Sequence, residues 1–155
     1  MINKVTIRQL KLVTATQARD IDALMKQLVP RYPRTATEVL IAAVATTPGN
    51  ALLVAQTEQF RIVGVLLLTR LAAITGDKVW IEDFVVDVEY RGQGIGRSLL
   101  KEAISYARAR GTTHINLTAQ PERSAARLLY ESAGFHRHNT DYYRLTLVVP
   151  GSSAA

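Results

Sequence analysis

The stretch that decides the fold is Val85-Val86-Asp87-Val88-Glu89-Tyr90-Arg91-Gly92-Gln93-Gly94-Ile95-Gly96-Arg97-Ser98, in which an apolar strand runs into three alternating glycines that open a helix. Glycines let backbone N–H groups approach a ligand closely, because no Cβ is in the way. The helix N-terminus adds unpaired N–H donors and about half a positive charge. The stretch therefore predicts a turn that binds a phosphate or pyrophosphate. Arg91, Arg97 and Lys101 add positive charge on the same turn and the first helical coil.

Two better-known glycine motifs do not fit this turn. A dinucleotide fingerprint, G-x-G-x-x-G, would need glycine where Arg97 or Leu99 stands. A Walker P-loop that starts at Gly92 would need Gly-Lys at the positions of Arg97 and Ser98. The pattern that remains is Arg-x-x-Gly-x-Gly over residues 91–96.

A second segment, Arg123 to Phe135, predicts a short helix that carries Ala126, Leu129 and Tyr130 and closes as Gly-Phe. The turn and this segment together resemble the acetyl-coenzyme-A signature of the GNAT N-acetyltransferase superfamily. In that family the short helix carries Asn-x-x-Ala-x-x-Leu/Phe-Tyr before its Gly-Phe. Arg123 stands where the asparagine usually sits, and an arginine there can bind a phosphate or a carboxylate instead.

The resemblance covers nearly the whole chain and is strongest over residues 79–135. It implies an α/β fold of the GNAT type, with a central mixed, mostly antiparallel sheet flanked by helices. A strand, the glycine turn, a helix and a further strand form its cofactor unit. We expect a single domain over residues 1–149 and a loose C-terminal tail over 150–155.

Hydrophobic periodicity and turn residues predict the individual elements. Helices are expected from a capping box at Thr14 to Pro30, over 37–45, from the glycine turn to Gly111, and from Pro121 to Gly134. Strands are expected over 5–8, 52–55, 62–71, 79–86, 115–119, 135–137 and 142–149. Turns alone separate the three strands between residues 52 and 86, which predicts an antiparallel meander before the cofactor unit.

The resemblance implies transfer of an acetyl group from acetyl-CoA to a primary amine, by direct attack in a ternary complex. An amine with a pKa near 10.4 is almost wholly protonated at neutral pH, so the reaction needs a general base. The leaving thiolate needs a proton donor, and the family places a tyrosine there, which is Tyr130 in this chain. Packing alone is the alternative role of that ring. The chain has no cysteine, which excludes a cysteinyl-enzyme route.

By the same resemblance, acetyl-CoA is bound by the end of the strand, the glycine turn and the start of the second segment. The expected cofactor-binding residues are Val85, Val86, Arg91, Gly92, Gln93, Gly94, Ile95, Gly96, Arg97, Ser98 and Arg123. The two valines are expected to act through backbone groups. His136 and His138 share one strand face without a third ligand, so we interpret them as surface residues and expect no metal.

Glu82 and Asp83 are the candidate bases, on the strand that leads to the glycine turn. Adjacent strand residues face opposite ways, so one of them should point into the cleft. One strand face is expected to carry Trp80, Phe84 and Val86. Glu82 interrupts that apolar face, where burial would raise its carboxyl pKa toward neutrality. We therefore choose Glu82 over Asp83, although a bulge in the strand would exchange the two.

Composition and net charge indicate the expected partners and location of the protein. The 155 residues carry 19 Lys and Arg against 13 Asp and Glu, a net charge of +6, which suits an anionic partner such as the phosphates of CoA. The longest apolar run, Ile62 to Leu68, is strand-sized, and the N-terminus lacks the apolar core of a signal peptide. We expect a soluble, cytoplasmic protein whose partners are acetyl-CoA and a small-molecule or peptide amine, with no nucleic acid and no membrane.

Other classes of function stay open. A GNAT-fold sensor would bind acetyl-CoA without transferring the acetyl group. The net charge and the arginines between Arg91 and Arg110 suggest a nucleic-acid-binding domain, although no helix-turn-helix, RNP-type strand or zinc finger is evident. The acceptor amine is also open, and residues 31–35 and 139–143 are the candidates for its site. Dimers are common in the family, so a homodimer is compatible with the resemblance.

Overall fold

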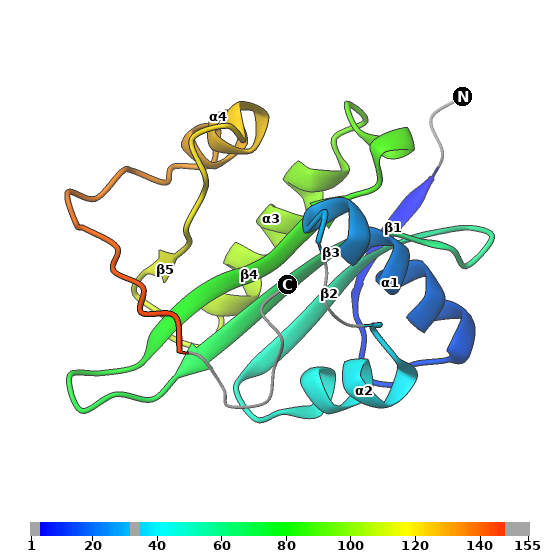
Figure 1. Ribbon diagram of the computed structural model, residues 1–155, viewed down its shortest axis with the longest axis horizontal. Helices are drawn as coiled ribbons and strands as arrows, with labels where there is room; N and C mark the ends of the chain where they lie inside the picture. Colours follow the sequence, from blue (N-terminus) through cyan, green and yellow to red (C-terminus); the bar gives the residue numbers. More distant parts are fainter. Residues whose placement is uncertain (1–3, 32–34, 148–155) are drawn as a thin grey trace.

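A five-stranded sheet lies at the centre of the molecule, with its strands in the order β1-β2-β3-β4-β5 (Figure 1). The structure is a computed structural model that describes residues 4–31 and 35–147. The strands are β1 Val5–Gln9, β2 Asn50–Thr57, β3 Ile62–Leu71, β4 Lys78–Val86 and β5 Ile115–Asn116. Neighbours from β1 to β4 are antiparallel, whereas β4 and β5 are parallel. The expected mixed, mostly antiparallel sheet is confirmed.

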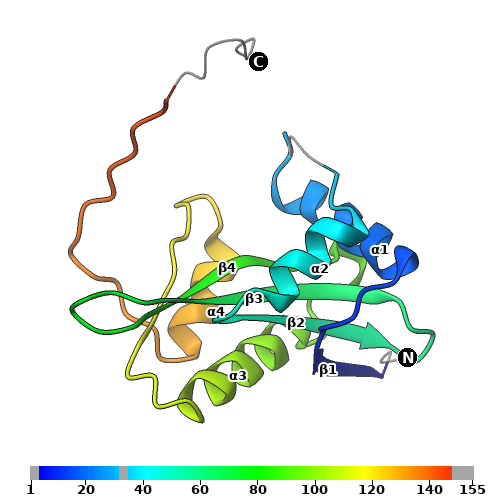
Figure 2. The ribbon, with the colours of Figure 1, turned by 90° about the horizontal axis from the view of Figure 1, so that it is seen from below.

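Helices cover both faces of the sheet. They are α1 Ala15–Leu28, α2 Glu38–Thr46, α3 Ile95–Arg108 and α4 Ser124–Ser132, with a short 3-10 helix, η1, at Val88–Tyr90. Figure 2 shows α1 and α2 on one side of the sheet and α3 on the other. The capping box is confirmed, because the Gln17 amide donates to Thr14 Oγ1 at 3.3 Å and Gln17 Oε1 accepts from the Thr14 amide at 3.0 Å. Within the described ranges, no helix has the length and apolar character needed to cross a membrane.

The core has two halves, one on each face of the sheet. Successive residues of β2 belong to different halves. Leu52 and Val54 pack in the half with α1 and α2, whereas Leu53 and Ala55 pack in the half with α3. A strand that is covered on both faces must be apolar at nearly every position, which explains the long apolar runs in β2 and β3.

Two carboxylates of α1 hold neighbouring segments by their backbone amides. Asp20 accepts from the Ile62 amide at 2.9 Å. Asp22 accepts from the Ala36 amide at 2.7 Å and pairs with Lys26 at 2.6 Å. The hydrogen bond from Lys26 and then that from the Ala36 amide hold the pKa of the Asp22 carboxyl below its usual range. Together these contacts fix α1 against the start of β3 and against the segment that leads into α2.

The C-terminal part of the described chain differs from the prediction. Residues 135–137 and 142–147, expected as strands, form none, while residues 148–149 and the expected tail at 150–155 lie outside the described residues. The alternation of apolar and polar residues is present, but a strand also needs a neighbouring backbone to bond to. In Figure 2 this orange and red segment runs clear of the sheet. Its apolar side chains are exposed, namely Tyr142, Tyr143, Leu145 and Leu147.

Candidate functional site

The glycine turn joins β4 to α3 through η1. Asp87 follows β4, and its buried carboxylate accepts from the Glu89 amide at 3.1 Å and from Arg61 at 3.2 Å. Gly92 and Gly94 have a left-handed backbone, with φ of +75° and +81°. Glycine is favoured at both positions because a side chain disfavours that conformation. A Cβ at either position would meet no heavy atom within 4 Å, so the turn opens outward.

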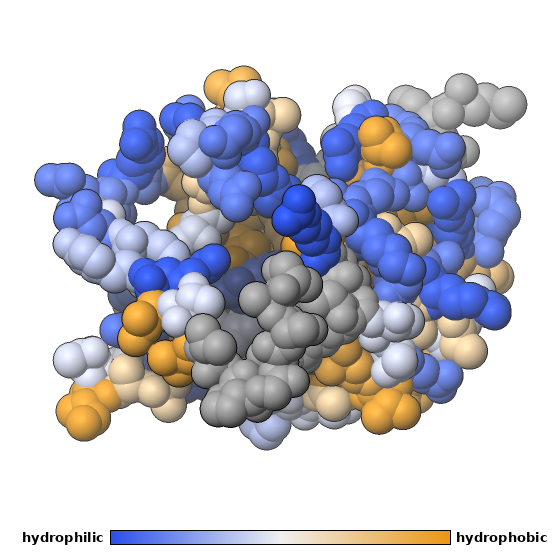
Figure 3. Space-filling model, in the orientation of Figure 1, coloured by the Kyte–Doolittle hydropathy of each residue, from blue (hydrophilic) through white to orange (hydrophobic). Residues whose placement is uncertain are grey.

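Among the described residues, no hydrogen-bond partner is found for the amides of residues 95–97, the first of α3. Gly94 is the N-cap of this helix and makes no side-chain capping bond. The helix dipole places positive partial charge at the same point. Arg91, Arg97 and Lys101 are exposed there. Hydrophilic residues predominate on the upper part of the face in Figure 3, where α4 and the segment before α3 lie. The arrangement can bind an anion.

Several side chains of the turn serve the turn itself. Ser98 Oγ donates to the Gly94 carbonyl at 3.2 Å, within the first coil of α3. Gln93 Nε2 donates to the Glu89 carbonyl at 3.4 Å. The side chain of Ile95 is buried in the core half with α3. For Gln93 and Ile95 the backbone amide is the group that remains for a ligand, whereas the Ser98 amide already donates to the Gly94 carbonyl at 3.0 Å.

The third glycine, Gly96, meets a packing requirement. A Cβ at this position would lie 3.2 Å from Leu129 Cδ2 and 3.7 Å from Phe84 Cζ. The first of these distances is closer than ordinary van der Waals contact. Gly96 therefore allows α3 to approach α4 and β4 closely, which brings the two expected cofactor segments together.

β4 and β5 separate beside the glycine turn. They pair only through residues 79–80 and 115–116. The expected strand at 115–119 is therefore shortened, because the chain turns away toward α4, which begins at Ser124. Within the described chain, the edge of β4 over residues 81–86 has no paired strand on this side.

Two arginines reach the open edge of β4. Arg123 Nη2 donates to the Phe84 carbonyl at 3.4 Å. Arg91 Nε donates to the Val86 carbonyl at 3.0 Å. Groups two residues apart on a strand point the same way, so the carbonyls of Phe84 and Val86 share this edge. Val85 lies between them and packs its side chain in the half with α1 and α2. The carbonyls on this edge thus belong to alternate residues, Phe84 and Val86.

Tyr130 lies on α4 with its ring buried between two phenylalanines. Its ring centroid is 6.0 Å from that of Phe84 and 6.0 Å from that of Phe135. Burial raises the pKa of the phenol, and the positive charge of Arg123 opposes this in part. Tyr130 is therefore protonated at neutral pH, and it lies against the same residue, Phe84, whose carbonyl forms the open edge.

A β-bulge interrupts β4 at the two candidate bases. The pairing with β3 shifts between Val65 and Leu67, so that Asp83 and Phe84 together face the single residue between them. Asp83 has φ of +42°, which is uncommon for a residue other than glycine. A bulge adds one residue to a strand and re-aims the side chains that follow.

Because of this bulge, the prediction of which residues share one face of β4 is wrong. Ile81 and Phe84 both pack in the core half with α3, whereas Val85 packs in the half with α1 and α2. The inserted residue reverses the alternation, so Glu82 shares no continuous face with Phe84 and Val86. Glu82 is also exposed, where the sequence had indicated a buried carboxylate.

Asp83 lines a cavity of about 290 Å³ between α1, α2 and the sheet. The other described lining residues are apolar, namely Ile21, Met25, Ala36, Leu40, Ile41, Val44, Leu52, Val65 and Leu67. Partial burial raises the pKa of the Asp83 carboxyl. Desolvation, and then the negative charge of Asp83, raise the pKa of the Glu82 carboxyl. Asp83 is exposed, as Glu82 is, and Asp83 is the one of the two that lines the cavity.

The wall of this cavity was not among the expected site residues. Its members on α1, Ile21 and Met25, belong to the apolar face that helical periodicity indicates. The same periodicity marks a core position and a cavity wall, so the pattern alone does not separate them.

The remaining predicted features are exposed or lie outside the described residues. Of the candidate acceptor segment 31–35, residues 32–34 lie outside the described residues, and residues 139–143 are exposed. His136 and His138 are exposed as well. In the part of the chain that the structure describes, no three His, Asp or Glu side chains gather into a metal-binding group.

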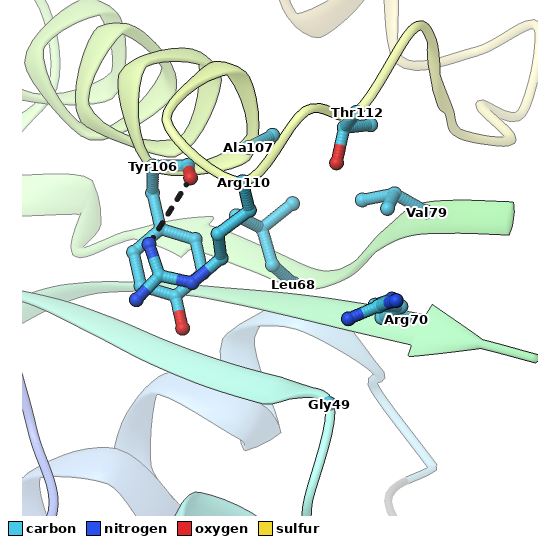
Figure 4. A pocket seen from close by; sticks show the side chains of 8 residues that line it. All are labelled: Gly49, Leu68, Arg70, Val79, Tyr106, Ala107, Arg110 and Thr112. Atoms are coloured by element: carbon cyan, nitrogen blue, oxygen red, sulfur yellow. Dashed lines mark hydrogen bonds between the residues drawn. The ribbon is translucent and has the colours of Figure 1, made fainter. Parts of the chain in front are cut away.

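A smaller cavity, of about 150 Å³, lies at the other end of α3 (Figure 4). Arg110 covers the ring of Tyr106, with its guanidinium carbon 3.5 Å from the ring centroid, and donates to the Tyr106 carbonyl at 3.2 Å. Arg70 pairs with Asp77. Because α3 has 14 residues, this cavity is about 20 Å from the glycine turn. Both arginines are engaged locally, and the cavity is separate from the site at β4.

A model of the acetyltransferase (GNAT) family matches residues 19–135, most of the chain. An acetyltransferase of Trypanosoma brucei has a similar structure, with a TM-score of 0.76 and 26% identity over 93% of this chain and 100% of that one. An aminoglycoside acetyltransferase from an uncultured soil metagenomic sample has a TM-score of 0.81 and 18% identity over 93% and 97%. The fold is thus that of acyl-transferring enzymes. The chain belongs to the GNAT family of acetyltransferases, and the family expected from the sequence is confirmed.

Curated relatives match a part of the chain. The [ribosomal protein bS18]-alanine N-acetyltransferase of Escherichia coli K12 is 35% identical over 72 residues, which are 45% of this chain and 49% of that protein. The mycothiol acetyltransferase of Thermobispora bispora is 41% identical over 56 residues, 36% of this chain and 19% of that protein. The matched part thus spans half or less of the length of these relatives.

Proposed function

We propose that this chain transfers an acetyl group from acetyl-CoA to a primary amine by direct attack in a ternary complex. One observation carries the proposal: two different sites meet at consecutive residues of β4. Phe84 lies on the open edge beside the glycine turn. Asp83, immediately before it, lines the cavity under α1 and α2. A donor on one side and an acceptor on the other would therefore have their reacting ends at the same point.

The glycine turn suits the pyrophosphate of acetyl-CoA. Gly92 and Gly94 leave open space where side chains would stand, and α3 directs its first amides into that space. The open edge of β4 suits the amides of the pantetheine arm, which can bond to it as an added strand. Because Arg91 and Arg123 bond to carbonyls of that edge, we expect one or both to turn toward the phosphates when acetyl-CoA binds.

Asp83 is the base in this proposal. Its raised carboxyl pKa moves it toward the range in which a general base works at neutral pH. Asp83 takes a proton from the ammonium group, directly or through a water, and the free amine nitrogen attacks the acetyl carbon. A C–N bond forms as the C–S bond breaks, and the new amide nitrogen releases its remaining extra proton to solvent. Glu82 is the alternative base, because its pKa is raised as well.

Tyr130 is the proton donor to the leaving sulfur. Its buried ring is held between Phe84 and Phe135, next to the open edge of β4. The phenol is protonated at neutral pH and gives its proton to the thiolate as the C–S bond breaks. The positive charge of Arg123 favours the phenolate that results, until solvent returns the proton.

A free-thiol assay with acetyl-CoA tests the proposal. We expect CoA release that requires both the protein and an amine, with one acetylated amine per CoA by mass spectrometry. Acetyl-CoA at about 100 times its Kd should also stabilise the fold by roughly 2.7 kcal/mol, a rise of several degrees in Tm. A rise in Tm without amine-dependent thiol release would instead identify a sensor of acetyl-CoA.

A further inference from the structure

The cavity that Asp83 lines is apolar over nearly its whole wall. Nine of its ten described lining residues are apolar, and they come from α1, α2, β2, β3 and the segment just before α2, which holds Ala36. Its volume of about 290 Å³ is nearly twice the roughly 150 Å³ of an apolar protein cavity that takes up benzene. The space is therefore sufficient for a phenyl ring or for a chain of several methylene groups.

A single charge faces this apolar wall. Asp83 is the one charged side chain among the described lining residues. The carboxylates of α1 are committed elsewhere, since Asp20 accepts from the Ile62 amide and Asp22 accepts from the Ala36 amide. One carboxylate at an apolar cavity matches a ligand with one ammonium group and one apolar substituent.

Acceptors with other charge patterns fit the cavity poorly. A polyamine or an aminoglycoside would bring several ammonium groups against one carboxylate, and an unpaired charge near an apolar wall is costly. A phosphorylated amine would place its negative charge against Asp83, which repels it. Charge complementarity thus selects among the amines that the proposed reaction leaves open.

We infer that the acceptor is a small primary amine with a single apolar alkyl or arylalkyl substituent. The substituent occupies the cavity, and the ammonium group lies at Asp83. The bulge places Asp83 directly before Phe84, whose carbonyl lies on the open edge of β4. This inference rests on the proposed function, because it assigns the cavity to the acceptor of that reaction.

A series of alkylamines tests the inference. Initial rates are measured with saturating acetyl-CoA and with propylamine, butylamine, pentylamine and hexylamine. Each additional buried methylene should raise kcat/KM by about fourfold. Spermidine, kanamycin and a peptide that begins with alanine should each give less than about a tenth of the hexylamine value. A flat series, or a preference for any of these three, overturns the inference and leaves acetyl transfer intact.

Two neighbouring residues of α2 provide a matched pair of variants. Leu40 lines the cavity, whereas Val39 is 79% exposed and is not a lining residue. Leu40→Gln should lower kcat/KM for hexylamine about tenfold, lower it less for propylamine, and leave KM for acetyl-CoA unchanged. Val39→Gln should change none of these. Equal effects of the two substitutions overturn the inference.

A binding measurement separates failure of this inference from failure of the proposed function. If acetyl-CoA raises Tm but no amine is acetylated, the proposed transfer is wrong. Hexylamine alone should still raise the Tm of the wild type and of Val39→Gln, and should not raise that of Leu40→Gln. The absence of any rise in the wild type overturns the assignment of the cavity.

Discussion

The two sides of β4 are built in different ways. The glycine-turn side is made largely of consecutive residues, from Phe84 to Ser98, and its backbone requires glycine at Gly92 and Gly94. The cavity side is assembled from helices and strands that lie far apart in the sequence, and an apolar residue of suitable size serves at most positions. A substitution in the turn should therefore abolish one function outright, whereas a substitution around the cavity should have a graded effect.

Gly94→Asp should have the largest effect. The side chain would be strained at φ of +81°, and its carboxylate would face the anion expected at the start of α3. We expect the rise in Tm caused by acetyl-CoA, which corresponds to roughly 2.7 kcal/mol at 100 times Kd, to disappear. The measurement is a thermal melt with and without acetyl-CoA.

Gly111→Asp is the matched control for this variant. Gly111 has φ of +73° and open space where a Cβ would stand, and it lies beyond the other end of α3. This variant should show a similar loss of folding stability and keep the rise in Tm with acetyl-CoA. If Gly94→Asp kept that rise as well, the pyrophosphate site would have to lie away from the turn.

Tyr130→Phe comes second and tests chemistry rather than binding. The ring and its packing against Phe84 and Phe135 are kept, and the hydroxyl alone is lost. Turnover should fall about 100-fold or more, with KM for acetyl-CoA within a few fold of the wild-type value. Tyr106→Phe, at the opposite end of α3, should leave both constants unchanged. Wild-type turnover in Tyr130→Phe would make the ring a packing residue and water the proton donor.

The two carboxylates of the bulge give the third prediction, which concerns pH. Asp83 accepts a proton only when ionised, so the wild-type rate should fall as pH drops through its raised pKa. Asp83→Asn should lower kcat/KM for the amine about 100-fold at pH 7 and replace the inflection at this pKa by a rate that rises steadily with pH. The deficit should shrink as pH approaches the pKa of the amine, because the amine then loses its proton unaided.

Glu82→Gln is the control for the pH profile. Glu82 does not line the cavity, so this variant should keep the inflection and most of the rate. A profile that changes with Glu82 and not with Asp83 would return the role of base to the residue that strand alternation favours. Rates that are unchanged in both variants would mean that solvent supplies the free amine.

The sequence predicts the glycine-turn side of β4 better than the cavity side, for a physical reason. A turn with positive φ and the ends of a helix favour particular residues, glycine above all. The sequence therefore locates the glycine turn, α3 and the Tyr130 segment to within a few residues. The sequence allows a bulge at Asp83 but does not indicate one, because one extra residue leaves no mark on an apolar strand. The strand expected at 142–147 shows the same limit, since alternation indicates a strand but does not supply the backbone to which it bonds.

Asp22 gives the smallest expected effect and tests how the cavity is supported. Asp22 is 8% exposed, and its carboxylate accepts from the amide of Ala36, which lines the cavity. Asp22→Asn removes the charge and the pair with Lys26, and it should cost about 1–2 kcal/mol in the free energy of unfolding. KM for the amine should rise while KM for acetyl-CoA stays constant, because the glycine-turn side does not depend on this contact. Glu58→Gln, in an exposed pair with Lys4 at 3.9 Å, is the control and should change neither.

The pH dependence of stability makes this last prediction specific. The folded-state pKa of Asp22 is lowered, so the stability it contributes is fully present above its unfolded pKa, about 4. That contribution is lost as pH falls through the lowered folded-state pKa. The difference in unfolding free energy between wild type and Asp22→Asn should therefore be constant from pH 5 to 8 and vanish in stronger acid. A difference that persists below both pKa values would show that packing around Asp22, and not its charge, holds the wall of the cavity.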